Sequence, residues 1–241
     1  MKLLPLSRSR VEASIAVAKI VFQHLQISLP GFARWTAAEW NQAKADYDEI
    51  RDCMLGWDVT DFGGSNFENI GRTIFTLRNG NLHDARYFKS YAEKIILFPE
   101  GQRAPAHFHR TKREDIINRG GGVVCVQLTS TSIDDQPSID PLIVVLDGRS
   151  QTIASGDIIR LNPGESLCVL PRTIHQFWGD EGTGLRIHGV GYTVGSEVSS
   201  VCDDLKDNFF FSDFTRFPRI IEDSPRIHYL CNEYPAATLG R

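Results

Sequence analysis

Short apolar segments alternate with turn residues over most of the chain beyond Lys94. The apolar segments are residues 95–98, 116–117, 123–128, 142–146, 158–161, 167–170 and 185–194. The turn signals between them are residues 119–122, 147–148, 155–157, 162–164 and 180–184. Many short strands with closely spaced turns predict a mainly β fold, either a β-sandwich or a β-barrel. No long helical pattern separates these segments, which argues against a doubly wound α/β fold.

The first ninety or so residues have a helical pattern instead. From Ser9 to Leu25, apolar side chains recur at spacings of three and four, which predicts an amphipathic helix that ends before Pro30. Thr36 and Glu39 form a capping-box signature, and a second helix is predicted through Trp40, Ala43, Tyr47 and Ile50.

We expect one structural domain with two parts. Residues 1–90 are predicted to form a helical extension, with a short β-rich run at 73–77, packed on a barrel of residues 91–241. The tail from about Asp203 alternates between polar and aromatic residues and is expected to wrap around the barrel and add an edge strand. The three Phe residues 209–211 cannot all point into one core from a strand, so a dimer contact explains them equally well.

The charge and hydropathy of the chain exclude several kinds of partner. Lys and Arg number 26 against 30 Asp and Glu, and no basic patch with interleaved aromatic residues is present, so we expect no nucleic-acid partner. The longest apolar runs are far shorter than a membrane span. The start of the chain lacks the apolar region and cleavage site of a signal peptide. We therefore expect a cytoplasmic protein without a membrane partner.

The five cysteines give no sign of a functional site. They are an odd, scattered set without a C-x-x-C pair, which argues against a disulfide framework and against a cysteine zinc site. Cys125 and Cys168 lie in apolar runs and are interpreted as small core residues.

The segment from Gly101 to Glu114 carries the strongest chemical signal. His107 and His109 are separated by one residue, so on a strand both imidazoles point to the same face. Glu114 follows a four-residue turn and begins the next apparent strand. His175, after Pro171 at the end of another strand, can supply a third nitrogen. Taken alone, a surface His-x-His pair can also occur by chance.

These four residues together suit one divalent metal ion. Three imidazoles and one carboxylate leave two exchangeable positions in octahedral geometry, which suits Mn²⁺ or Fe²⁺. Zn²⁺ binds such ligands too, and affinity alone would favour it over Mn²⁺. We expect Mn²⁺, with Fe²⁺, Co²⁺ and Zn²⁺ left open.

The same segment resembles the first motif of the cupin family, G-x5-H-x-H-x3–4-E-x6-G. Gly101, His107, His109, Glu114 and Gly121 stand in its five positions. The second cupin motif is matched less well. Gly164, Pro171 and His175 are recognisable, but the spacings differ and Gly179 stands where the motif has Asn. The resemblance implies a jelly-roll β-barrel with the metal inside it, here with an N-terminal helical extension.

A closer resemblance, to the D-lyxose isomerase family, covers most of the chain. It rests on the stretches 29–35, 197–199, 203–208, 216–220 and 228–234 together with the N-terminal helices. It implies a metal-dependent enzyme that interconverts D-lyxose with D-xylulose, and often D-mannose with D-fructose, through an enediol. It also implies a homodimer, and a lysine at position 112 that works with an acidic residue.

Lys112 and Glu197 are the predicted acid-base pair. Lys112 lies in the turn between His109 and Glu114, so it must lie near the metal, although the turn could also be a solvated basic loop. Burial near a positive ion would lower the pKa of this lysine. Glu197 is the preferred acidic partner because it follows the predicted strand 185–194, and Asp204 and Asp207 are its rivals.

Other residues were considered for sugar contacts. His188 is expected to point inward because residues 186, 188, 190 and 192 share one face of the predicted strand 185–194. Phe177, Trp178 and Tyr192 could form a flat wall for a sugar ring, although such residues more often serve packing. His24 and His83 are assigned no role.

Two other functions remain possible on the sequence. Another metal-dependent cupin enzyme, such as an iron dioxygenase acting on a small acid, would require O₂. A non-enzymatic sugar-binding or storage-type barrel has no use for a polar cluster in its interior, which is costly to bury.

Overall fold

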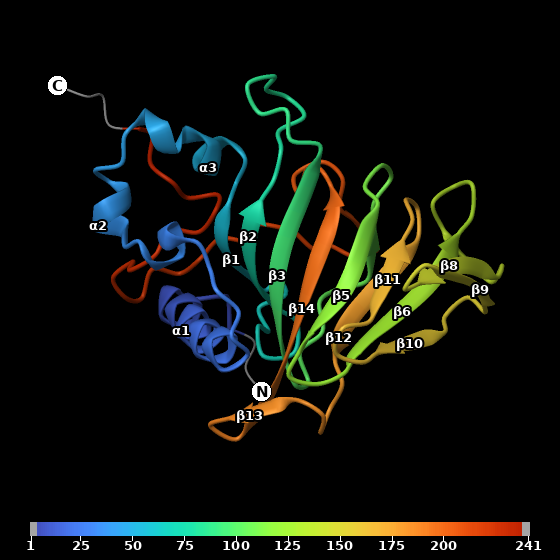
Figure 1. Cartoon of the computed structure of the whole chain (residues 1–241). Helices are drawn as coiled ribbons and strands as arrows, with labels where there is room; N and C mark the ends of the chain where they lie inside the picture. Colours follow the sequence, from blue (N-terminus) through green and yellow to red (C-terminus); the bar gives the residue numbers. More distant parts are fainter. Residues whose placement is uncertain (1–3, 238–241) are drawn as a thin grey trace.

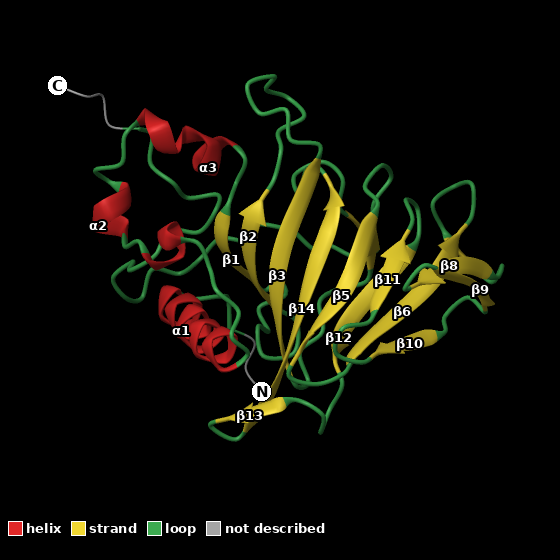
Figure 2. Ribbon diagram, viewed as in Figure 1, coloured by secondary structure: helices red, strands yellow, loops and turns green. Residues whose placement is uncertain are grey.

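The computed structural model describes residues 4–237 and is built around two antiparallel β-sheets (Figures 1 and 2). Nine strands of the described chain form the larger sheet. Its path is β1 (Gly56–Thr60), β2 (Arg72–Arg78), β3 (Tyr91–Pro99), β14 (Val190–Ser200), β5 (Glu114–Gly120), β11 (Ser166–Val169), β8 (Leu142–Leu146) and β9 (Arg149–Ile153), with β13 (Leu185–Ile187) paired to β14.

The smaller sheet has six strands within the same described residues. Its path is β10 (Ile158–Leu161), β6 (Val124–Thr131), β12 (Ile174–Gly179), β4 (His107–Phe108) and β15 (Phe209–Phe210), with β7 (Pro137–Ser138) paired to β6. Buried apolar side chains from both sheets pack into one core, including Phe98, Ile116, Leu128 and Phe177. The mainly β fold predicted from the sequence is confirmed.

The larger sheet is covered on both faces near β3. Ile96 and Phe98 belong to the core between the sheets, whereas Ile95 and Leu97 belong to a second cluster that includes the N-terminal helix. This alternation follows from the two-residue period of a strand. It explains why residues 95–98 form an unbroken apolar run.

The predicted N-terminal helix is confirmed as α1 (Arg8–His24), which lies beside the sheet in Figure 1. The Ser7 side chain accepts a hydrogen bond from the backbone N–H of Arg10 and caps the helix. The buried face of α1 packs on the sheet, where Phe22 stacks on Trp57 with 6.4 Å between ring centroids.

The second predicted helix is wrong as a continuous element. The structure has a 3₁₀ turn at Gly31–Arg34 (η1), then α2 (Ala37–Trp40), a second 3₁₀ turn at Ala45–Tyr47 (η2) and α3 (Asp48–Asp52). The Arg51 guanidinium donates hydrogen bonds to the carbonyl oxygens of Ala43 and Lys44, at 2.9 and 3.0 Å. These carbonyls are therefore satisfied without a helical turn. The predicted capping box of Thr36 and Glu39 is present at α2.

The predicted strand 185–194 is also wrong as a single strand. Residues 185–187 form β13 and pair with β14 through a two-residue turn, in which Ile187 is opposite Val190. His188 and Gly189 in this turn have φ values of 49° and 84°. Positive φ at both positions is the conformation of tight hairpin turns whose twist matches that of the strands. His188 is exposed, so its predicted inward orientation is wrong.

The first ninety residues contribute strands as well as helices. β1 and β2 extend the larger sheet beyond β3, with Ile74 of β2 opposite Ile96 of β3. The division of the chain at residue 90 stays a prediction. The edge strand predicted in the tail is confirmed, because β15 pairs with β4 and extends the smaller sheet.

The C-terminal tail is attached to α1 by a buried arginine. Arg8 is fully buried and donates hydrogen bonds to both carboxylate oxygens of Glu222 and of Glu233, at 2.5 to 3.1 Å. The hydrogen bond from Arg8 lowers the pKa of Glu222 to about 2. The red tail accordingly runs among the N-terminal helices in Figure 1.

We predict that Arg8→Met lowers the free energy of unfolding by about 2 kcal/mol, because two carboxylates lose a buried partner and one of them is partly exposed. Urea denaturation at pH 7 measures the change. In the wild type the pKa of Glu222 is depressed in the folded state, so its contribution to stability is present above about pH 4.5 and is lost as the pH falls toward 2. Arg8→Met should lack this pH-dependent contribution. Arg10→Met, on the exposed face of the same helix, is the control and should change stability by less than about 1 kcal/mol. Equal effects of the two substitutions would contradict this interpretation.

Candidate active site

The two sheets bring the predicted site residues to one place between them. β4 contributes His107, with His109 just beyond its end, and β12 contributes His175 directly opposite His107. Glu114 is the first residue of β5 in the larger sheet. His109, Glu114 and His175 are 1 to 3% exposed, and His107 is half-buried. As expected, His175 follows a strand that ends just before Leu170 and Pro171, and it is the second residue of the next strand, β12.

The motif glycines begin and end this segment in conformations that favour glycine. Gly101 precedes β4 with a φ of 80°, and Gly121 follows β5 with a φ of 89°. A Cβ atom on Gly121 would lie 2.5 Å from the carbonyl oxygen of Tyr192, so another residue would displace the backbone of β14.

The three imidazoles point their free nitrogens at one another. Potential ligand atoms of His107, His109 and His175 all lie within 4.8 Å of one another. Each Nδ1 donates a hydrogen bond to a backbone carbonyl oxygen. The acceptors are Pro105, Asp207 and Thr173, in that order. Because a carbonyl can only accept, each Nδ1 carries the proton and each Nε2 presents a lone pair. The cluster could therefore hold a metal ion.

Unsatisfied polar atoms inside the cluster fit a cation. Nε2 of His109, Nε2 of His175 and Oε1 of Glu114 are buried without a hydrogen-bond donor, whereas Oε2 of Glu114 has Nζ of Lys112 as its ion-pair partner. Nε2 of His175 lies 2.9 Å from Oε1 of Glu114, although both atoms are acceptors in these protonation states. Two acceptors at this distance repel each other unless a positive charge lies between them, and buried unsatisfied polar groups are costly. The donor set is thus suited to a divalent ion.

The electrostatics keep two of the imidazoles in the form that binds metal. Burial, followed by the neighbouring His175, holds the pKa of His107 well below its usual value. Burial, followed by the charge of Lys112, lowers the pKa of His109 to about 4. Both rings are therefore neutral at neutral pH, as metal ligation requires.

Lys112 and Glu197 form a buried ion pair beside the histidines. Nζ of Lys112 lies 2.9 Å from Oε1 of Glu197 and 2.5 Å from Oε2 of Glu114. Glu197 is within β14, next to β5, and is 5% exposed. Burial opposes the charge of Lys112, but Cys202 and the two carboxylates raise its pKa well above the usual value. The charges of the protein itself therefore favour the ammonium form of Lys112. This effect is opposite in direction to the lowered pKa that we expected from the charge of a nearby metal ion.

The two rival carboxylates have other partners. Asp204 accepts hydrogen bonds from Nζ of Lys94 at 2.9 and 3.1 Å, and lies 3.8 Å from Nη2 of Arg216. Asp207 accepts hydrogen bonds from the backbone of residues 110–112. Of the three carboxylates considered as partners of Lys112 in the sequence, Glu197 is the one that contacts its ammonium group, whereas Asp207 binds its backbone N–H.

Sequence reasoning missed several buried charges next to the site. Lys94 is 3% exposed, and Arg216 pairs with Asp58 of β1. Cys202 lies with its Sγ 3.4 Å from Oε1 of Glu197. Lys94 could have been found, because residues 94, 96 and 98 share the inward face of β3 and a lysine on such a face needs a partner. Asp58 and Arg216 are too far apart in sequence to be paired by any local pattern.

The aromatic residues proposed as a sugar wall lie in different places. Phe177 packs in the core and stacks on His175, and Tyr192 belongs to the cluster around α1. Trp178 is buried beside the guanidinium of Arg103. The aromatic ring next to His107 is instead Phe210 of β15, with 5.5 Å between ring centroids.

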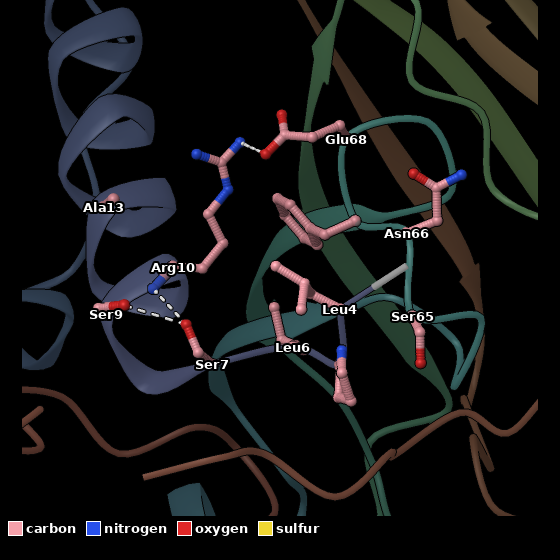
Figure 3. Close-up of a pocket in the computed structure, with 11 residues that line it drawn as sticks. Leu4, Leu6, Ser7, Ser9, Arg10, Ala13, Ser65, Asn66 and Glu68 are labelled. Carbon is pink, nitrogen blue, oxygen red and sulfur yellow. Dashed lines mark hydrogen bonds and ion pairs between the residues drawn. The ribbon is translucent and has the colours of Figure 1, made fainter. Parts of the chain in front are cut away.

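A separate cavity of about 430 Å³ lies at the start of the described chain (Figure 3). It lies between the beginning of α1 and residues 65–68, and Arg10 and Glu68 form an ion pair beside it. Its lining includes none of the six predicted site residues. Among residues 4–237, no helix is both long enough and apolar enough to cross a membrane.

The architecture is that of known sugar isomerases. An L-ribose isomerase from Cellulomonas parahominis superposes with a TM-score of 0.58 at 15% identity, covering 92% of this chain and 99% of that one. An L-ribose isomerase from Geodermatophilus obscurus superposes with a TM-score of 0.57 at 15% identity, covering 88% and 95%. Together with the two sheets described above, these similarities confirm the predicted cupin fold.

Sequence relatives identify the class and then the family. The chain is 42% identical over 230 residues to the D-lyxose/D-mannose isomerase of Escherichia coli O157:H7, covering 95% of this chain and 98% of that protein. It is 45% identical over 214 residues to the D-lyxose/D-mannose isomerase of Serratia proteamaculans, covering 88% and 91%. The protein is thus a sugar isomerase that interconverts aldoses and ketoses. The sequence profile of the D-lyxose isomerase family matches residues 6–234, and the chain belongs to that family.

We predict that Mn²⁺ stabilises the EDTA-stripped protein, because an ion in the cluster satisfies the lone pairs of the folded state alone. At a concentration 100 times the Kd, binding adds about 2.7 kcal/mol, which corresponds to roughly 5–10 °C in Tm. Scanning calorimetry with and without Mn²⁺ measures this shift. His175→Ala should abolish the shift, and His188→Ala, on the exposed hairpin turn, should retain it. A full shift in His175→Ala would exclude the cluster as the binding site.

Proposed function

We propose that the protein is a metal-dependent isomerase that interconverts D-lyxose with D-xylulose, and D-mannose with D-fructose, between its two sheets. His107, His109, Glu114 and His175 would hold the ion, and Lys112 and Glu197 would move the protons. The observation that carries this proposal is the buried Lys112–Glu197 pair directly beside the converging histidines. The names of the two relatives support the choice of sugars.

The two aldoses are a chemically consistent pair of substrates. D-Lyxose and D-mannose have the same configuration at C2, C3 and C4, and differ by the additional carbon of the hexose. Isomerisation changes C1 and C2 alone, so one arrangement of acid, base and ligands can serve both sugars. Moving the carbonyl from C1 to C2 converts D-lyxose into D-xylulose and D-mannose into D-fructose.

We infer that the ion is Mn²⁺, with Fe²⁺, Co²⁺ and Zn²⁺ as alternatives. Three imidazole nitrogens and a carboxylate form a mixed nitrogen and oxygen set that suits these ions. When bound, the ion supplies a Lewis acid that polarises the sugar carbonyl and stabilises the developing negative charge. Neutral His107 and His109 need not lose a proton to bind it.

Glu197 and Lys112 have the charges required for the two kinds of proton transfer. Although burial opposes ionisation, the charge of Lys112 lowers the pKa of Glu197, so this carboxylate is available as a base. We propose that Glu197 takes the proton from C2 of the aldose and returns it to C1. Lys112, as an ammonium, donates a proton to O1, and it recovers one from the hydroxyl at O2 when the enediol becomes the ketose. No atom is gained or lost in the cycle.

The cellular setting is proposed from the chain itself. All five cysteines have free thiols in the structure, and four of them are buried. Unpaired thiols are typical of a reducing compartment, so we propose a cytoplasmic enzyme. The homodimer expected from the family resemblance stays a prediction, as does the absence of nucleic-acid and membrane partners.

We predict that EDTA-stripped protein forms ketose from D-lyxose and D-mannose only after Mn²⁺ is restored, under anaerobic conditions. In D₂O, the product should carry deuterium at C1, because the proton passes through a carboxylate that exchanges with solvent. Ketose quantification and NMR measure the two results. Equal turnover without metal would exclude metal dependence. A metal-loaded protein that acts on neither sugar, or that needs O₂, would refute the proposed reaction.

We also predict that Lys112→Ala lowers kcat at least 100-fold, because a general acid or base commonly contributes a factor of this size. Bound Mn²⁺ should remain near one per chain, since the histidines and Glu114 are retained. Arg113→Ala, the exposed neighbour in the same turn, is the control and should keep the wild-type kcat. A normal kcat in Lys112→Ala would show that the assigned proton transfer is wrong even if the metal site is right.

A further inference from the structure

Asp207, in the C-terminal segment, contacts both His109 and the turn that carries Lys112. Asp207 lies between the end of β14 and β15, nearly one hundred residues from the histidine motif in sequence. Its side chain binds the turn of residues 110–112, and its backbone carbonyl binds His109. The described structure therefore joins the tail to a metal-ligand candidate and to the turn that carries Lys112.

The carboxylate of Asp207 is surrounded by donors from that turn. Oδ1 accepts the N–H of Arg110 at 2.8 Å. Oδ2 accepts the N–H of Lys112 at 3.0 Å, the N–H of Thr111 at 3.3 Å and the hydroxyl of Thr111 at 2.6 Å. Three successive backbone N–H groups that converge on one anion form a nest, and a carboxylate holds such a turn strongly because each bond is charge-assisted.

Within this turn the backbone N–H groups of residues 110–112 donate to Asp207, whereas the other contacts hold the Arg110 side chain, through Asp135, and the flanking residues His109 and Arg113. Arg110 and Thr111 are exposed, and neither residue belongs to a strand. The side chain of Lys112 must nevertheless enter a buried position between Glu114 and Glu197. A displacement of the turn would move Nζ of Lys112 relative to both carboxylates, and small misplacements of a reacting group can greatly reduce its effectiveness.

The backbone carbonyl of Asp207 acts on the neighbouring ligand. It accepts a hydrogen bond from Nδ1 of His109 and so keeps Nε2 free of a proton. Partners of this kind orient a metal ligand and raise its basicity, and their loss typically weakens metal binding 10- to 100-fold. If the carboxylate released the turn, this carbonyl would be free to move away from His109.

We propose that Asp207 is a positioning residue that fixes Lys112 and His109 together, so that the acid-base group and the metal ligand are set by one anchor in the tail. This inference rests on the proposed function for its kinetic consequence. Its consequence for metal binding and for the conformation of the turn holds whether or not D-lyxose is the substrate.

Asp207→Asn tests the proposal, because it keeps the size of the side chain but removes the charge and places an amide donor among N–H donors. We expect kcat for D-lyxose to fall at least 10-fold with KM within threefold, and the Kd for Mn²⁺, measured by calorimetry on the EDTA-stripped protein, to rise about 10-fold. Hydrogen exchange should become faster at the backbone amides of residues 110–112.

Asp203→Asn is the matched control, since Asp203 lies four residues earlier and binds the exposed His83 at 2.9 Å. It should leave kcat, Mn²⁺ affinity and exchange at residues 110–112 unchanged. A purely structural role for Asp207 would lower Tm in the variant but leave kcat and Mn²⁺ affinity unchanged well below Tm, and that result would overturn the proposal.

Thr111→Val provides a second variant if Asp207→Asn does not fold, because it removes one donor to the same carboxylate. We expect a smaller decrease in kcat and faster exchange of the turn, and wild-type values for both would overturn the proposal. If the wild-type protein converts no sugar, the proposed function fails, whereas Mn²⁺ affinity and amide exchange still decide the role of Asp207.

Discussion

A buried charge that must be paired organises the site. Lys112, Glu114 and Glu197 are removed from water between the sheets, and an unpaired ion there would cost several kcal/mol. Lys112 contacts both carboxylates, so the turn before β5, the first residue of β5 and the middle of β14 have to meet at one point. The same contact brings Glu114 to the three histidines of the opposite sheet. The proposed metal binding and the proposed proton transfer therefore depend on one arrangement of charges.

The tail that follows β14 is joined to the larger sheet by further buried ion pairs. Asp204 pairs with Lys94, and Arg216 pairs with Asp58, which connects the segment after β14 to β3 and β1. Further on, residues of the tail bind Arg8 at the beginning of α1. The tail is thus joined to the sheet and to the helical extension through paired buried charges. The family match, over residues 6–234, likewise includes this tail and is not limited to the histidine motif.

Local patterns predicted what depends on near neighbours. Strand periodicity placed His107 and His109 on one face, and the amphipathic spacing predicted α1. Prediction from local patterns failed where one pattern is compatible with two different structures. The apolar run at 185–194 reads as one strand, but its tight turn at His188 and Gly189 makes a hairpin and turns His188 into solvent. The stretch at 40–50 has a helical pattern, but the Arg51 side chain takes the carbonyls that a helix would use.

The sequence by itself determined the cupin class and placed His107, His109, Glu114 and Lys112 together, because these residues lie in a short motif whose spacing dictates their direction. His175 was identified from its position after Pro171 in the second, less well matched motif. Tertiary structure decided which carboxylate meets Lys112, since Glu197, Asp204 and Asp207 are close in sequence and differ only in where β14 and the following segment carry them. It also decided the partners of Lys94, Arg8 and Arg216. Contacts between distant residues depend on strand order and packing, and no spacing along the chain encodes either one directly.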